Sequence, residues 1–209
     1  MTAKKLPLPL ENTSVKLYGS LGERVASGLL DGVFLAPVTI GVLFFNSLHL
    51  YNYYYTFVVT QLIIAAYCIY LPVRYGATPG KRAMGLTILT IDGSAIAYRE
   101  AFLKYLPMLV IGLFAFVIQA WTIGLADEAK YNSLSWMEQS KYLQSVSQFP
   151  LWIEMVVIYV YYIATLLMVI IDKRNRSVSD RLAGTVVIHT RALEEIAELD
   201  SWFNTEQKG

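Results

Sequence analysis

The sequence is poor in charge and nearly lacks cysteine. Only 16% of its 209 residues are charged and 56% are hydrophobic, whereas ordinary soluble domains carry about 25% charge. The composition therefore indicates a membrane protein in contact with the lipid bilayer. The single cysteine, Cys68, excludes a disulfide framework and a cysteine-based metal cluster. The formal net charge of +1 shows no basic excess, so we expect no nucleic-acid partner.

Recognisable catalytic and cofactor-binding patterns are also absent. We find neither a nucleophile with its base nor a metal-ligand spacing, and the glycine-rich loop that cradles nucleotide phosphates is missing. The two histidines, His49 and His189, are expected on opposite sides of the membrane. We therefore expect no catalytic residues, no metal and no cofactor, and the chain is not expected to be an enzyme.

Four long apolar segments predict transmembrane helices at about 24–45, 53–73, 104–125 and 151–171. A spanning helix needs about 20 mostly apolar residues to cross a hydrocarbon core of about 30 Å, because its backbone polar groups must be satisfied internally. Ser20 and Glu23 form a capping-box pattern that marks the start of the first helix. The predicted fold class is an all-α membrane protein with short cytoplasmic strand segments.

Basic residues flank these segments mainly on one side. All but two of the 17 Lys and Arg residues lie in the N-terminal arm, the loop after the second helix, or the C-terminal tail, and the exceptions are Lys130 and Lys141. Since basic residues are retained on the cytoplasmic side, both termini are predicted to be cytoplasmic. The chain then divides into a cytoplasmic arm (1–19), a transmembrane domain (20–190) and a cytoplasmic amphipathic tail (191–209).

Two similar segments follow the two pairs of helices. Residues 85–90 and 184–190 are predicted strands, and a turn at Asp92-Gly93 predicts a further strand at 94–98. Each of the first two strands follows an R-x-x-G pattern, which indicates two parallel repeats. The alternative is that the chain has no internal repeat, and that the two segments are similar only because short strands that follow a glycine resemble one another. The residues of these cytoplasmic motifs are Gly80, Lys81, Arg82 and Gly85 in one copy and Asp180, Arg181 and Gly184 in the other.

Two further helices are predicted outside the spans. Ser135 and Glu138 form a second capping-box pattern, which predicts a short interfacial helix in the outer loop. Leu193, Ile196, Leu199 and Trp202 recur at helical spacing opposite an acidic face. This C-terminal helix is expected to dock on a second copy or another membrane protein rather than on anionic lipid, unless it is a frayed tail.

Asp31 is the costliest residue of the predicted spans. An ionisable group deep in lipid costs roughly 2.5–3.5 kcal/mol, so it is a functional candidate by default. Arg24 lies nearly two turns before Asp31 on the same helix face. The adjoining strip of Gly28, Gly32 and Ala36 is predicted to let another helix approach closely. Asp31 is then either a buried structural carboxylate, paired with a base such as Arg24 or Lys104, or a proton or cation site.

Other polar residues have more ordinary interpretations. Glu154 is predicted to be interfacial, and Gln61 to hydrogen-bond between helices. Basic residues of the two motifs are commonly anchors of the cytoplasmic side. A sharper hypothesis is that the segment Gly80-Lys81-Arg82 meets Asp180-Arg181 beneath the helices, in an ion-pair network that closes the inner face.

Three segments resemble the RDD family of bacterial membrane proteins. They are RVASGLLD at 24–31, GATPGKRAMGLTILTIDG at 76–93 and SVSDRLAGTVVI at 177–188. Arg24, Asp31 and Asp180 match the family's arginine and two aspartates. Ser179 replaces a common histidine, and Lys104 stands where arginine is frequent. The resemblance covers about residues 19–190 and implies a bacterial inner-membrane location and solute or ion transport, including cation and proton exchange.

Two functions are predicted. The first is a small transporter of ions or small solutes, expected to be oligomeric, in which Asp31 carries a cation or proton and the cytoplasmic motifs gate access. The second is a non-enzymatic subunit or assembly factor of a larger membrane complex. In the second, Asp31 only stabilises the fold.

Overall fold

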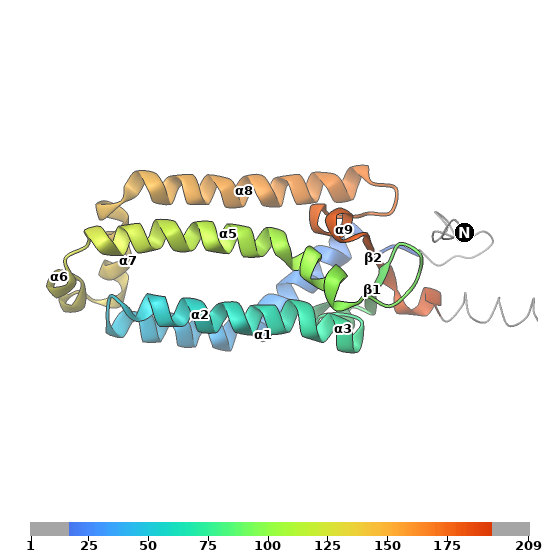
Figure 1. Ribbon diagram of the computed structural model, residues 1–209, viewed down its shortest axis with the longest axis horizontal. Helices are drawn as coiled ribbons and strands as arrows, with labels where there is room; N and C mark the ends of the chain where they lie inside the picture. Colours follow the sequence, from blue (N-terminus) through green and yellow to red (C-terminus); the bar gives the residue numbers. More distant parts are fainter. Residues whose placement is uncertain (1–16, 194–209) are drawn as a thin grey trace, which may run out of the picture.

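The computed structural model describes residues 17–193 as four long helices with a small sheet at one end (Figure 1). The spans are α1 (Leu21–Leu48), the segment Asn52–Tyr75, α5 (Tyr98–Leu125) and α8 (Gln148–Ile171), and each is long and apolar enough to cross a membrane. The four predicted transmembrane helices are confirmed. The end with the sheet is called the sheet end below, and its predicted cytoplasmic orientation stays a prediction.

The second span is interrupted near the sheet end. It consists of α2 (Asn52–Ala65), a π-helical turn η1 (Ala66–Tyr70) and α3 (Leu71–Tyr75). A π-helical turn inserts an extra residue into the helix and is frequent at functional sites. Here η1 carries Tyr67, whose hydroxyl reaches Asp31.

The helix starts follow the capping patterns. The Ser20 backbone N–H donates to Glu23 Oε2 at 2.8 Å, and Glu23 N–H donates back to Ser20 Oγ at 3.4 Å. At the opposite end of the bundle lie α6 (Glu128–Ser133) and α7 (Trp136–Val146) (Figure 1). Ser135 N–H donates to Glu138 Oε2 at 3.0 Å before α7, so the short helix predicted in this loop is confirmed.

The sheet pairs the two predicted motifs with each other. Strands β1 (Leu86–Thr90) and β2 (Thr185–His189) run antiparallel, with Leu86 opposite His189 and Thr90 opposite Thr185. One face packs Leu89 and Ile188 against Tyr18, and the other packs Ile88 and Val187 against Ala101. The tail beyond residue 193, including its predicted docking helix, and most of the predicted arm lie outside the described residues.

The strand predicted at 94–98 is wrong. Ala95 makes a single bridge to Leu89, and α5 already begins at Tyr98. Asp92 accepts hydrogen bonds from the backbone and hydroxyl of Ser94, while Ala97 N–H donates to Glu100 Oε2 at 3.1 Å. The turn and the helix start therefore leave too few residues between them for a strand.

The backbone supports the predicted repeat. Short helices α4 (Pro79–Ala83) and α9 (Val178–Ala183) each end before a left-handed glycine, Gly85 or Gly184, and both glycines have φ +65°. Gly85 C=O accepts from Thr190 N–H at 2.9 Å, and Gly184 C=O accepts from Ile91 N–H at 3.0 Å. These bonds are symmetric because each donor lies the same number of positions after the glycine of its own copy. In the same way α4 packs on α1, and α9 packs on α5.

The predicted packing strip on α1 is not used within the chain. Gly28 and Gly32 are exposed, and a Cβ atom added at either would meet nothing within 4 Å. Ala36 is only partly buried. Within residues 17–193, α4 packs closely on a different face of α1, so the role of this strip in packing stays a prediction.

Candidate functional site: the polar cluster at the sheet end

Asp31 lies on α1 with both carboxylate oxygens engaged. Oδ1 accepts from the Tyr67 hydroxyl at 2.6 Å and from Gly80 N–H at 2.7 Å. Oδ2 accepts from Thr78 Oγ1 at 2.7 Å and lies 3.5 Å from Lys81 Nζ. The Asp31 side chain is 14% exposed. A carboxylate this deep in a span is tolerated because donors from η1 and α4 replace its water.

Gly80 makes this close approach possible. A Cβ at Gly80 would lie 2.6 Å from both Asp31 N and Asp31 Oδ1, and closer still to the Ser27 carbonyl oxygen. Any side chain here would push α4 away from α1. Pro79 begins α4 and leaves no N–H group to satisfy at that position. The glycine that governs helix packing is therefore Gly80 rather than Gly28 or Gly32.

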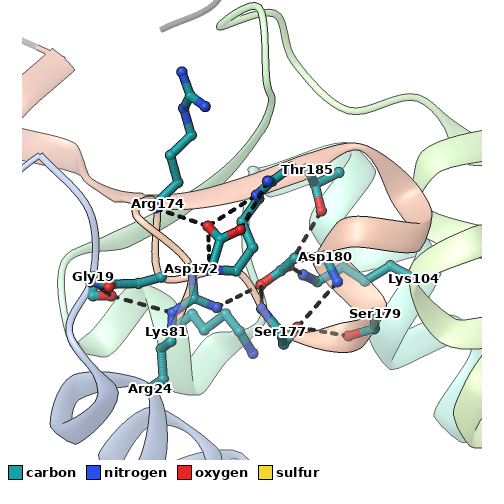
Figure 2. Close-up of polar contacts among 12 residues, drawn as sticks. Gly19, Arg24, Lys81, Lys104, Asp172, Arg174, Ser177, Ser179, Asp180 and Thr185 are labelled. Atoms are coloured by element: carbon teal, nitrogen blue, oxygen red, sulfur yellow. Dashed lines mark hydrogen bonds and ion pairs between the residues drawn. The ribbon is translucent and has the colours of Figure 1, made fainter. Parts of the chain in front are cut away.

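Asp180 on α9 is the second acidic centre and is fully buried (Figure 2). It accepts from Arg24 Nη1 at 2.7 Å and pairs with Lys104 Nζ. Ser177 N–H donates to it at 3.1 Å and Thr185 Oγ1 at 3.3 Å. Two cations from α1 and α5 thus converge on one carboxylate. Burial of a charge costs less when the charge is paired and hydrogen-bonded, as it is here.

Asp172, directly after α8, is the third acidic centre (Figure 2). Its carboxylate accepts from the guanidinium groups of Arg176 and Arg181 and from Arg174 N–H. Burial alone raises the pKa of Asp172, but these hydrogen bonds outweigh it and hold the pKa well below its usual range. The sequence analysis missed Asp172. The sequence feature that could have identified it is the position of this aspartate, directly after the last apolar residue of a span and directly before a cluster of basic residues.

The two predicted partners of Asp31 both bind elsewhere. Arg24 and Lys104 pair with Asp180, and Lys81 pairs with Asp31. In the first repeat, Asp31 lies on the long helix α1 and Lys81 on the short helix α4. In the second repeat the base, Lys104, lies on the long helix α5 and the acid, Asp180, on the short helix α9. Shared position on a helix face did not identify the partner of Asp31, because Arg24 reaches the other repeat.

The prediction that the segment Gly80-Lys81-Arg82 forms ion pairs with Asp180-Arg181 is wrong. Lys81 pairs with Asp31, Asp180 pairs with Arg24 and Lys104, and Arg181 pairs with Asp172. The Arg82 guanidinium lies over the Tyr75 ring, 5.8 Å from the centroid. The salt bridge between Arg24 and Asp180 joins the two repeats.

Polar residues elsewhere have local roles. Tyr105 OH donates to Gln61 Oε1 at 2.7 Å, so the predicted hydrogen bond between helices is confirmed. This pair lines a cavity of about 240 Å³ between the second span, α5 and α8. Glu154 is partly buried near the end of α8 opposite the sheet.

The histidines lie at opposite ends of the bundle. His49 pairs with Glu128 at 2.9 Å, and His189 pairs with Glu23 at 3.2 Å. Within residues 17–193, no three His, Cys, Asp or Glu side chains are grouped to hold a metal ion.

The model of the RDD family matches residues 18–184 of the chain. No curated protein matches the chain, and no solved structure does. The family match covers most of the chain, including Arg24, Asp31 and Asp180. The chain therefore belongs to the RDD family.

Proposed function

We propose that this membrane protein is not an enzyme but a small transporter that exchanges a cation for a proton at Asp31. The observation that supports this most is the Asp31 carboxylate itself, which lies inside a span beside the hydroxyls of Tyr67 and Thr78. Its longest polar contact is the one to the Lys81 ammonium, at 3.5 Å.

This oxygen-rich arrangement suits a hard cation. Small hard cations prefer carboxylate, hydroxyl and carbonyl oxygens. The hydroxyls of Tyr67 and Thr78 donate to Asp31 in the present state, but each oxygen also has acceptor lone pairs. When a cation binds, Lys81 withdraws and the hydroxyls turn these lone pairs toward the cation.

Protonation of Asp31 leads to the same release of Lys81. A neutral carboxyl group no longer attracts the ammonium, so the proton and the cation compete for one carboxylate. Such competition couples their movements. The Arg24–Asp180 bridge, which joins the repeats at the sheet end, acts as the gate that must rearrange before that end opens.

Ion flux into proteoliposomes tests the proposal. A proton gradient across the liposome membrane is expected to drive sodium or potassium in the direction opposite to the protons. Asp31→Asn is expected to abolish this exchange. Lys81→Gln removes the competitor and should lower the cation concentration that gives half-maximal flux. Asp92→Asn is the matched control, since Asp92 is exposed in a turn. Undiminished exchange by folded Asp31→Asn protein contradicts the proposal.

The orientation is part of the proposal. The sheet end faces the cytoplasm of a bacterial inner membrane if the distribution of basic residues governs insertion. In a Cys68→Ser background, the Ser94→Cys variant is expected to resist a membrane-impermeant thiol reagent in intact cells. Labelling at Ser94 before lysis contradicts this orientation.

A non-enzymatic subunit or assembly factor is the second candidate. It is favoured by the bare face of α1, where Leu29 is 70% exposed and Val33 68% beside Gly28 and Gly32. Absence of exchange by folded, inserted wild-type protein would favour this role. In a Cys68→Ser background, an added two-electron oxidant should then join the thiol of the Gly32→Cys variant to the same thiol of a second copy, or to a cysteine thiol of another membrane protein, in a disulfide.

A further inference from the structure

An open groove lies at the sheet end between α3 and α4. Its volume is about 430 Å³, and its lining is apolar apart from one tyrosine and one arginine. Arg82 is exposed there, and its guanidinium lies over the Tyr75 ring. The lining residues are Leu71, Tyr75, Ala77, Pro79, Arg82 and Ala83.

The corresponding place in the second repeat is filled by ion pairs. Arg181, which matches Arg82, donates to Asp172 at 2.8 Å. The position that matches Asp172 in the first repeat is Val73, and the position that matches Arg176 is Ala77. The first repeat therefore has the arginine but lacks the carboxylate at the matching position. No carboxylate within residues 17–193 forms an ion pair with Arg82.

We propose that this groove binds an anionic phospholipid, whose phosphate takes the place at Arg82 that Asp172 takes at Arg181. A guanidinium donates two parallel hydrogen bonds to phosphate as readily as to carboxylate. Tyr75 is the last residue of the second span and is 52% exposed, which suits the headgroup layer. Basic pockets beside spans bind such headgroups.

The apolar lining favours a lipid over a free phosphate ion. Leu71 and Ala83 offer hydrocarbon surface next to Arg82, which a free phosphate cannot use but the glycerol and acyl segments of a lipid can. The groove also lies beside the lipid-facing end of a span, where lipid is at high local concentration.

Native mass spectrometry of the purified, delipidated full chain tests the site. The protein is titrated with phosphatidylglycerol, with phosphatidylcholine of the same acyl chains, and with glycerol phosphate. Wild type is expected to retain phosphatidylglycerol preferentially. Arg82→Gln should weaken its retention about tenfold, because one charge-assisted contact is lost. Arg99→Gln is the matched control, since Arg99 is exposed at the start of α5 outside the groove.

A second variant tests the groove while Arg82 is kept. Ala83→Glu places a carboxylate in the groove, where it pairs with Arg82 and repels phosphate, so the same loss is expected. Equal retention by wild type, Arg82→Gln and Ala83→Glu overturns the proposal, as does equal retention of the two lipids by wild type. Equally tight binding of glycerol phosphate would assign the site to a soluble phosphate instead.

Discussion

Gly76 and Asn175 occupy matching places in the two halves of the chain, and both have left-handed backbones, with φ +77° and +51°. Asn175 is the only non-glycine residue with a positive φ between residues 17 and 193. Asparagine tolerates this conformation better than other residues with a side chain. The separation of this pair along the sequence equals that of Gly85 and Gly184. The two repeats therefore share left-handed backbone angles at matching positions even where the residue types differ.

Substitution of the two strand-leading glycines is expected to cost the same. Gly85→Ala and Gly184→Ala should each lower the free energy of unfolding by about 1–2 kcal/mol, because a Cβ is strained at this φ. Neither new Cβ meets an atom within 4 Å, so backbone strain alone decides the result. Unfolding by SDS titration measures it. Gly124→Ala, inside α5 and equally uncrowded, is the control and should be neutral or stabilising; a neutral result at Gly85 or Gly184 contradicts the argument.

Gly80 is expected to be far less tolerant than Gly28. Gly80→Ala should lower the free energy of unfolding by about 3 kcal/mol, since the methyl group overpacks the contact between α4 and α1. It should also displace the donors of Asp31. Gly28→Ala meets nothing within 4 Å and should leave stability unchanged or raise it slightly. SDS unfolding of both variants compares them directly, and equal costs would show that α4 and α1 do not meet as described.

The sequence predicts the spans well because lipid imposes a strong and local constraint on them. A run of about 20 apolar residues rarely forms any structure other than a membrane-spanning helix. The strands were also predicted, since β-branched residues follow a glycine at 85 and 184. The strand at 94–98 failed because the Asp92 turn and the Glu100 cap act on the same few residues.

The partners within the polar cluster could not be read from the sequence. Helical periodicity shows that Arg24 and Asp31 share a face, but it carries no information on which distant segment approaches that face. Asp180 attracts Arg24 across the repeats, and the approach of Gly80 brings Lys81 to Asp31. The choice of partner is a property of tertiary packing rather than of local spacing.

Asp180 is expected to matter more for stability than an exposed acid. Asp180→Asn leaves Arg24 and Lys104 without their buried counter-charge and should lower the free energy of unfolding by about 3–5 kcal/mol. Replacing Lys104 by Met in the same protein removes one orphaned cation and should recover part of the loss. Asp92→Asn, at the surface, should change stability by less than about 0.5 kcal/mol. In the double-mutant cycle, strictly additive effects of Asp180→Asn and Lys104→Met contradict the pairing.

Asp172 predicts how stability depends on pH. Hydrogen bonds from arginines hold its pKa below the usual value in the folded state, so the folded protein binds a proton there less readily than the unfolded chain does. The stabilisation by this carboxylate is therefore fully present above the unfolded pKa of about 4 and is lost as the pH falls below it.

Comparison of wild type with Asp172→Asn isolates this contribution from the other carboxylates. The difference between their free energies of unfolding should be constant from pH 7 to about pH 5 and should shrink as the pH falls toward 3. The shrinkage follows because the wild-type carboxylate gains protons in the unfolded chain first, while the asparagine does not titrate. SDS unfolding at a series of pH values measures both proteins. A difference that stays constant down to pH 3 would show that Arg176 and Arg181 do not stabilise the ionised Asp172 in the folded protein.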